Sequence, residues 1–307
     1  MSIFLGFDTS NYTTSTAAVG GDFILSERQI LDVKKGQRGL RQSDAVFLHI
    51  KNMPELYGKL AAEIDKADIK AVGVSTKPRN AAGSYMPVFL AGQGYAKIAA
   101  DTLGVPLYEY SHQDGHIMAG IVSGGCEELL ERDFLSVHLS GGTTEILRSS
   151  FTGYAFENKI VGGTKDISAG QLIDRVGVSL GIKFPCGKAM ETLSEKAEKC
   201  MRLKVCTDGG FANFSGAETA LLRANISNEE KAMSTLAHVA KTLAAMLNNV
   251  IKSEKISEVL IVGGVASNKF LRKYLDENTN GRIYYASPAY STDNAVGIAA
   301  LAQKGGR

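Results

Sequence analysis

The sequence predicts an α/β fold of two lobes that share one design. The first lobe opens with a strand, a polar turn, a second strand and a hairpin, at 3–7, 8–11, 13–19 and 20–22. The same unit returns about 130 residues later as a strand, a turn and a strand, at 134–139, 140–143 and 144–148. A chain of 307 residues also exceeds one comfortable hydrophobic core, so two domains are expected.

Helices and strands alternate after each of these units. In the first half, hydrophobic periodicity predicts a helix, a strand, a helix and a short strand, at 44–67, 70–75, 89–103 and 105–108. In the second half it predicts three helices and a strand, at 168–180, 185–202, 227–254 and 258–262. We expect one lobe to comprise 1–110 with 290–307, and the other to comprise 111–289 with a helical insertion.

The composition is typical of a globular protein without a membrane segment. Hydrophobic residues make up 44% and charged residues 21%, and no apolar run reaches the ~18 residues needed to span a bilayer. The first residues lack the basic segment of a signal peptide, so we expect a cytoplasmic protein. The cysteines show no C-x-x-C spacing and are expected to be free. A net charge of +2 neither requires nor excludes a nucleic-acid partner.

Two histidines carry the clearest chemical signal. His112 and His116 have helical i, i+4 spacing, which places both rings on one face where a single divalent metal can bridge them. The alternative is two packed or exposed histidines without a metal. The glycine loop at 140–143 follows a predicted strand, and its backbone N–H groups can bind a phosphate or carboxylate. Together the two features predict a substrate that carries phosphate.

Another glycine loop follows the predicted strand at 258–262. Gly263 and Gly264 would let the backbone approach a base or ribose, and Asn268 precedes a helix. Asn268 either binds the nucleotide or acts only as the helix N-cap. Two α/β lobes that each open with such a hairpin resemble the superfamily of actin, hexokinase and the heat-shock chaperone ATPases. That resemblance implies an actin-like ATPase (ASKHA) fold, in which duplicated RNase H-like domains enclose a nucleotide and metal cleft.

A series of motifs makes the resemblance more specific. The chain contains, in order, HxxxH, SGG-T, GQLIDRVG-SLG, FPCGKAMETL, NFSGAETALLR, VGGVASNKFLR and STDNAVGIA. This series is similar to the TsaD family of threonylcarbamoyl-adenosine synthases, once called O-sialoglycoprotein endopeptidases. The resemblance implies an acyltransferase that moves a threonylcarbamoyl group from threonylcarbamoyl-adenylate to the N6 amine of a tRNA adenosine.

The resemblance also implies site residues. One divalent metal, iron or zinc, would be bound by His112, His116 and Asp293, although Asp293 can also be read as a helix N-cap. Adenylate or ATP would bind as a substrate-type ligand. Its binding residues would be Leu139, Ser140, Gly141, Gly142, Thr143, Asp174, Gly187, Gly263, Gly264 and Asn268. Asp8 or the substrate phosphate would take the proton from the attacking amine. The expected partners are tRNA and a TsaB-like subunit, with no membrane.

Several positions depart from the family pattern. Tyr12 and Thr13 replace two acids of the N-terminal turn, Thr143 replaces a histidine, and Glu218 replaces a lysine. The glycine loop of the family near position 80 is here the segment 77–80, Lys-Pro-Arg-Asn. These departures indicate a divergent paralogue.

They also leave two alternative functions. One is a carbamoyltransferase for a small molecule, and the other is an inactive nucleotide-binding partner subunit, which the three metal ligands argue against. A zinc-peptidase function is excluded, because Gln113 stands where such a helix needs glutamate.

Overall fold

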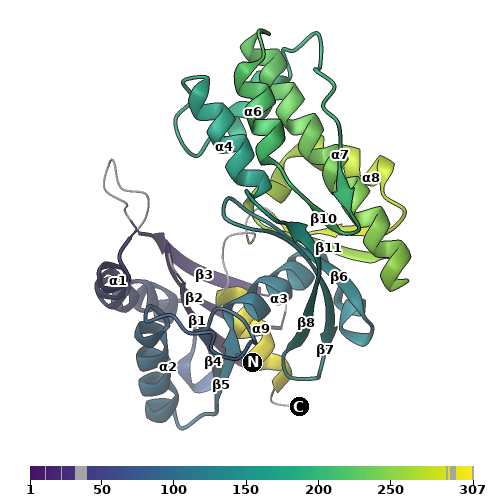
Figure 1. Ribbon diagram of the computed structural model, residues 1–307. Helices are drawn as coiled ribbons and strands as arrows, with labels where there is room; N and C mark the ends of the chain where they lie inside the picture. Colours follow the sequence, from purple (N-terminus) through teal and green to yellow (C-terminus); the bar gives the residue numbers. More distant parts are fainter. Residues whose placement is uncertain (11, 22, 32–39, 288–289, 291–294, 306–307) are drawn as a thin grey trace. The chain divides into compact units, whose positions relative to one another are not determined.

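The computed structural model describes residues 1–10, 12–21, 23–31, 40–287, 290 and 295–305 (Figure 1). The chain divides into two compact units. Unit 1 comprises 1–127, 151–157 and 289–307, and unit 2 comprises 128–150 and 158–288. The first unit therefore extends beyond the expected 1–110 and includes helix α3 (His112–Gly124). Helix α3 packs so closely on helix α9 (Ala295–Gly305) that a Cβ on Gly297 would collide with the Gly115 carbonyl.

Unit 1 contains a five-stranded sheet in the order β3-β2-β1-β4-β5. The strands are β1 (Ile3–Ser10), β2 (Thr13–Gly20), β3 (Phe23–Ile30), β4 (Ile69–Lys77) and β5 (Leu107–Ser111). Strands β1, β2 and β3 are antiparallel neighbours, whereas β1, β4 and β5 run parallel. The N-terminal hairpin is thus confirmed. Its first strand extends to Ser10, and Asp8 pairs with Ser15 of β2. The expectation that a turn begins at Asp8 is therefore wrong.

Helices cover both faces of this sheet. Besides α3 and α9, unit 1 contains α1 (Gln42–Ala62), the 3₁₀ turn η1 (Lys66–Asp68) and α2 (Phe89–Leu103). Leu5 and Phe7 of β1 pack in one apolar core with Met53 of α1 and Ala96 of α2. Gly6 faces the opposite side, where a Cβ would collide with the backbone of α9. Small residues on that face allow α9 to lie directly against the sheet.

Unit 2 repeats this strand order and extends it. Its seven-stranded sheet has the order β12-β11-β6-β7-β8-β10-β9. The strands are β6 (Phe134–Leu139), β7 (Thr144–Phe151), β8 (Phe156–Thr164), β9 (Thr207–Asp208), β10 (Phe211–Ala212), β11 (Glu258–Val262) and β12 (Arg282–Tyr285). Strands β6 and β7 are antiparallel, and β6, β11 and β12 are parallel, as in β1, β2, β4 and β5. The predicted duplication of the α/β unit is confirmed.

The helices of unit 2 surround the long helix α7. They are α4 (Ala169–Ser179), α5 (Gly187–Ser194), α6 (Ser215–Arg223), α7 (Asn228–Glu254) and α8 (Lys269–Asn278), with 3₁₀ turns η2 (Glu127–Glu131) and η3 (Gly264–Ser267). Leu236 and Leu243 of α7 pack in one core with Leu135 and Val137 of β6. The helix expected at 185–202 ends at Ser194. Beyond it, the Met201 N–H donates to Ser234 of α7, 2.8 Å away, so this segment is tied to α7.

Within the described ranges, no helix is both long and apolar enough to cross a membrane.

Candidate metal and nucleotide sites

The two histidines lie at the start of α3, as the spacing predicts. The helix begins where β5 ends, at Ser111, which caps it by accepting a hydrogen bond from the Asp114 N–H. His112 and His116 stand one turn apart, and their ring centroids are 4.7 Å apart. The structure therefore places both rings together in unit 1.

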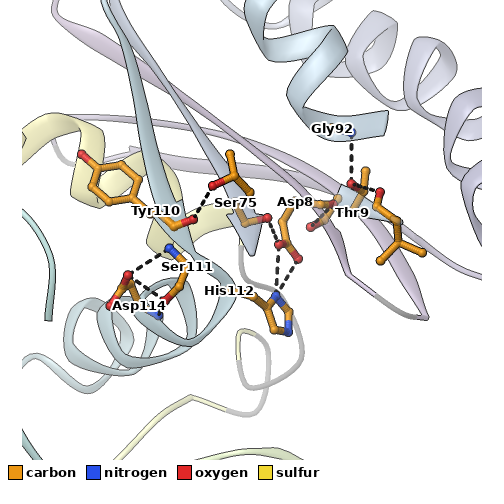
Figure 2. Close-up of polar contacts among 11 residues, drawn as sticks. Asp8, Thr9, Ser75, Gly92, Tyr110, Ser111, His112 and Asp114 are labelled. Atoms are coloured by element: carbon orange, nitrogen blue, oxygen red, sulfur yellow. Dashed lines mark hydrogen bonds and ion pairs between the residues drawn. The ribbon is translucent and has the colours of Figure 1, made fainter. Parts of the chain in front are cut away.

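Asp8 of β1 contacts the first of these rings (Figure 2). Nδ1 of His112 lies 3.1 Å from both carboxylate oxygens of Asp8, and the Ser75 hydroxyl of β4 donates to the same carboxylate. Asp8 is only 1% exposed. Burial alone would raise the pKa of Asp8, but the adjacent His112 and the hydrogen bonds from His112 and Ser75 hold that pKa below its usual value. An ionised Asp8 accepts from Nδ1, so Nε2 is the nitrogen with which His112 would bind a metal.

A second buried carboxylate fixes the first turn of α3. Asp114 accepts hydrogen bonds from the Ser111 N–H at 2.9 Å and from the Ser111 hydroxyl at 2.7 Å. Nδ2 of Asn80 donates to both Asp114 oxygens, and the Phe156 N–H donates at 3.2 Å. Burial raises the pKa of Asp114, although these hydrogen bonds act in the opposite direction.

The third expected ligand, Asp293, lies outside the described residues. In the described part of the chain, no group of three or more His, Cys, Asp or Glu side chains is arranged to hold a metal. The histidine pair still fits a metal, because two imidazoles share one helix face and one of them is oriented by a carboxylate.

The glycine loop at 140–143 in unit 2 is closed by its own hydrogen bonds. The Ser140 hydroxyl accepts from the N–H groups of Gly142 and Thr143, at 3.3 and 3.1 Å. These two amides are therefore engaged within the loop, in contrast to the expectation that they face an anion. The carbonyl of Gly141 accepts from the Ser168 hydroxyl at the start of α4, 2.8 Å away. A Cβ on Gly141 or Gly142 would meet no atom within 4 Å, so the outer side of the loop is open.

Asp174 lies in the middle of α4, and Gly187 is the first residue of α5. The half-buried Asp174 accepts a 2.7 Å hydrogen bond from the Cys186 N–H, next to Gly187 at the start of α5. Burial raises the pKa of Asp174, against the effect of this hydrogen bond. Asp174 thus has a protein partner, at a position where the family resemblance implies contact with the nucleotide. Gly187 is exposed, with open space where its Cβ would be.

The loop after β11 is shaped by Gly263. Its φ of 106° suits glycine, and a Cβ there would collide with the Leu139 carbonyl at the end of β6. Gly264 is exposed and open. Asn268 accepts from the Leu271 N–H at 2.9 Å, so the expectation of an N-cap is confirmed. Glu191 of α5 accepts from the Lys269 N–H at 2.6 Å, which places a second oxygen at the start of α8.

The departures from the family pattern occupy different settings. Glu218, which stands in place of a lysine, lies 3.2 Å from Arg175 and forms an ion pair with it. Tyr12 is 42% exposed beside Thr13, the first residue of β2. The Thr143 carbonyl accepts from the Ser140 N–H at 2.9 Å.

Sequence reasoning missed Ser75, Asn80, Asp114 and Glu191. Ser75 ends a predicted strand, and Asp114 lies between the two histidines, so both offered a positional signal. Asn80 lies in the segment 77–80 that departs from the family pattern, but its partner is 34 residues away in the chain. Glu191 gave no signal, because its partner is 78 residues away.

Comparison with known proteins identifies the family. The model of the TsaD family, described as tRNA N6-adenosine threonylcarbamoyltransferase, matches residues 24–300. A protein of that name from Thermosipho africanus is 28% identical over 318 residues, covering 98% of this chain and 94% of the relative. Another, from Chlamydia muridarum, is 26% identical over 324 residues, covering 98% and 91%.

The solved structures agree on the fold. A ROK family glucokinase from Streptomyces griseus superposes with a TM-score of 0.57 at 12% identity, covering 99% of this chain and all of the glucokinase. The chain therefore has the actin-like ATPase fold. With the family model matching most of its length, the chain belongs to the TsaD family of tRNA N6-adenosine threonylcarbamoyltransferases, which are acyltransferases.

Proposed function

We propose that this protein transfers a threonylcarbamoyl group from threonylcarbamoyl-adenylate to N6 of a tRNA adenosine. The observation that carries this proposal is the family match over 24–300, which spans the histidine pair and the glycine loops at 140–143 and 263–264. The two relatives are named as the tRNA enzyme, and the alignments with this chain cover nearly their full lengths. No specific observation favours a small-molecule acceptor or an inactive subunit. The TsaB-like partner and the cytoplasmic location stay predictions of the resemblance.

One divalent metal, iron or zinc, is part of the proposal. His112, His116 and Asp293 would hold it. When bound, it would supply Lewis-acid polarisation of the donor and a template for its orientation. Asp8 would keep His112 in the tautomer that carries hydrogen on Nδ1, because an ionised carboxylate can only accept there.

The buried position of Asp8 bears on the proton transfer. Asp8 is 1% exposed and already accepts from His112 and Ser75, so an incoming amine would have to displace one of these contacts. We therefore assign Asp8 to positioning His112, and the phosphate of the departing nucleotide to proton acceptance. In the transfer, the N6 nitrogen bonds to the carbamoyl carbon and the bond from that carbon to the phosphate oxygen breaks. The amine proton passes to the phosphate, and AMP leaves.

Unit 2 would bind the nucleotide part of the donor. Gly141, Gly142, Gly187 and Gly264 have open space at their Cα atoms, which lets a ligand approach the backbone. Asn268 uses its carbonyl oxygen as a cap, so its amide NH₂ is the group that would face a base or phosphate. Leu139, Ser140, Thr143, Asp174 and Gly263 would contribute by holding the backbone of these loops.

The test is transfer in a purified system. The full chain, threonylcarbamoyl-adenylate and unmodified tRNA are incubated with iron(II) or zinc, and the tRNA nucleosides are analysed by mass spectrometry. The proposal predicts threonylcarbamoyl-adenosine in the tRNA, and its loss in His112→Ala. Consumption of the adenylate without a modified nucleoside, with and without a TsaB-like subunit, would overturn the assignment of tRNA as acceptor.

A further inference from the structure

The loop between β4 and α2 forms hydrogen bonds with the first turn of α3. The carbonyl of Pro78 accepts from the Gln113 N–H at 3.1 Å. Two residues later, Nδ2 of Asn80 donates to the Asp114 oxygens at 2.9 and 2.7 Å. The loop thus contacts the two positions that follow His112 in the helix.

The far end of the same loop also lies beside the histidines. The carbonyl of Val88 accepts from the Thr9 hydroxyl at 2.9 Å, which ties the start of α2 to β1. The Phe89 ring lies 6.0 Å from the His112 ring, centroid to centroid. One end of the loop therefore contacts Gln113 and Asp114, the other packs beside the His112 ring, and Nδ1 of His112 faces Asp8.

Asp114 is the acceptor through which this loop acts. It is completely buried and stands at the third helical position, between His112 and His116. The hydrogen bonds from Ser111 are local to the helix cap, whereas Asn80 is the side chain that reaches Asp114 from another element. Asn80 also donates to the Phe156 carbonyl at 3.2 Å. A buried carboxylate that loses such a donor must move or recruit another.

We propose that Asn80 is a positioning residue for the metal site. By holding Asp114, it fixes the first turn of α3 so that His112 and His116 present their rings to one ion. The inference rests on the proposed binding of a metal by these histidines. It assigns a role to the segment 77–80, where this chain departs from the glycine loop of its family. Loss of a partner that hydrogen-bonds a ligand directly typically costs about 10- to 100-fold in metal affinity. Asn80 acts one contact further out, through Asp114, so we expect the lower end of this range.

The test is cobalt(II) binding by the metal-free full chain, measured by chelator competition and by the visible absorption spectrum of the bound ion. Asn80→Ala is expected to bind cobalt(II) about 10-fold more weakly, with a changed absorption band. Ser84→Ala is the matched control, because Ser84 accepts from the Arg79 N–H at 3.1 Å within the same loop. Its affinity and spectrum should equal those of the wild type. Asn80→Ser, which is too short to reach Asp114, provides a second variant should Asn80→Ala fail to fold.

A double-mutant cycle with Asp114→Asn tests the route of the effect. If Asn80 acts through Asp114, the double variant should bind cobalt(II) no more weakly than Asp114→Asn alone. Wild-type affinity and spectrum in Asn80→Ala, with only a lower melting temperature, would make Asn80 merely structural. If wild type and His112→Ala bind cobalt(II) equally, the metal site itself is wrong, and the role of Asn80 falls together with the metal part of the proposed function.

Discussion

Nδ1 of His112 lies 3.1 Å from each carboxylate oxygen of Asp8, a residue 104 positions earlier in the chain. This contact joins the first strand of unit 1 to the helix that carries the histidine pair. It makes Asp8 a determinant of how His112 is oriented.

Removing the charge of Asp8 should therefore weaken metal binding. Asp8→Asn keeps the shape of the side chain but offers one acceptor oxygen and an NH₂ donor in place of two acceptors. We expect roughly 10- to 100-fold lower metal affinity, measured by chelator competition. Circular dichroism should remain native-like. Unchanged affinity would assign Asp8 a role other than orienting His112.

The two glycines of the loop after β11 are expected to have different roles. Gly263 is required by the fold, and Gly264 by the ligand. Gly263→Ala must accommodate a positive φ and a collision with the Leu139 carbonyl, so we expect it to lower the unfolding free energy by about 1–3 kcal/mol or more. Gly264→Ala has open space and should change stability by less than about 0.5 kcal/mol. Urea unfolding measures both effects.

If this loop binds adenosine, Gly264→Ala should nevertheless weaken AMP binding, because its methyl group would project where the ligand approaches. Calorimetric titration with AMP measures the affinity of the wild type and of Gly264→Ala. Wild-type affinity in Gly264→Ala would remove this glycine from the nucleotide site.

Asp166 predicts a pH dependence of stability in unit 2. Its carboxylate accepts from the N–H groups of Phe214 and Ser215 at 2.8 and 2.9 Å, at the start of α6. Burial would raise the pKa of Asp166, but its hydrogen bonds with Ser215, Phe214 and Ile167 hold the pKa below its usual value. The stabilisation is therefore present above the unfolded-state pKa of about 3.9 and is lost as the pH falls toward the folded pKa.

We expect Asp166→Asn to be less stable than the wild type at pH 7 by up to about 1 kcal/mol, the usual scale of a helix cap. The difference in unfolding free energy between the two proteins should become smaller as the pH falls from about 5 toward 2. Denaturant unfolding at both ends of this range gives the comparison. A difference in unfolding free energy that stays constant with pH would show that the charge of Asp166 does not contribute to stability.

The repeated strand unit and the histidine pair were predictable, because both depend on short-range patterns. Apolar or Thr- and Ala-rich runs next to turn residues predict β1, β2, β6 and β7. The i, i+4 spacing predicts that His112 and His116 share a helix face. The contacts that orient this helix were not predictable in the same way. Asn80 reaches Asp114 across 34 residues, and only tertiary packing brings them together.

Prediction from local sequence pattern was also wrong where a segment forms its hydrogen bonds with another element. Residues 195–202 have a helical pattern but lie beyond the end of α5, and the Met201 N–H donates to Ser234 of α7. Asp8 looked like a turn residue because it is polar after an apolar run. Its partners Ser75 and His112 allow it to be buried within β1.

The most direct test of the account is the metal content of the purified protein, measured by elemental analysis. If His112 and His116 form the centre that Asp8 and Asp114 position, the wild type should carry about one transition metal per chain, lost in the His112→Ala, His116→Ala double variant. The double variant should retain the circular dichroism spectrum of the wild type. Metal retained at the wild-type level in that folded variant would contradict the assignment of the metal centre to α3.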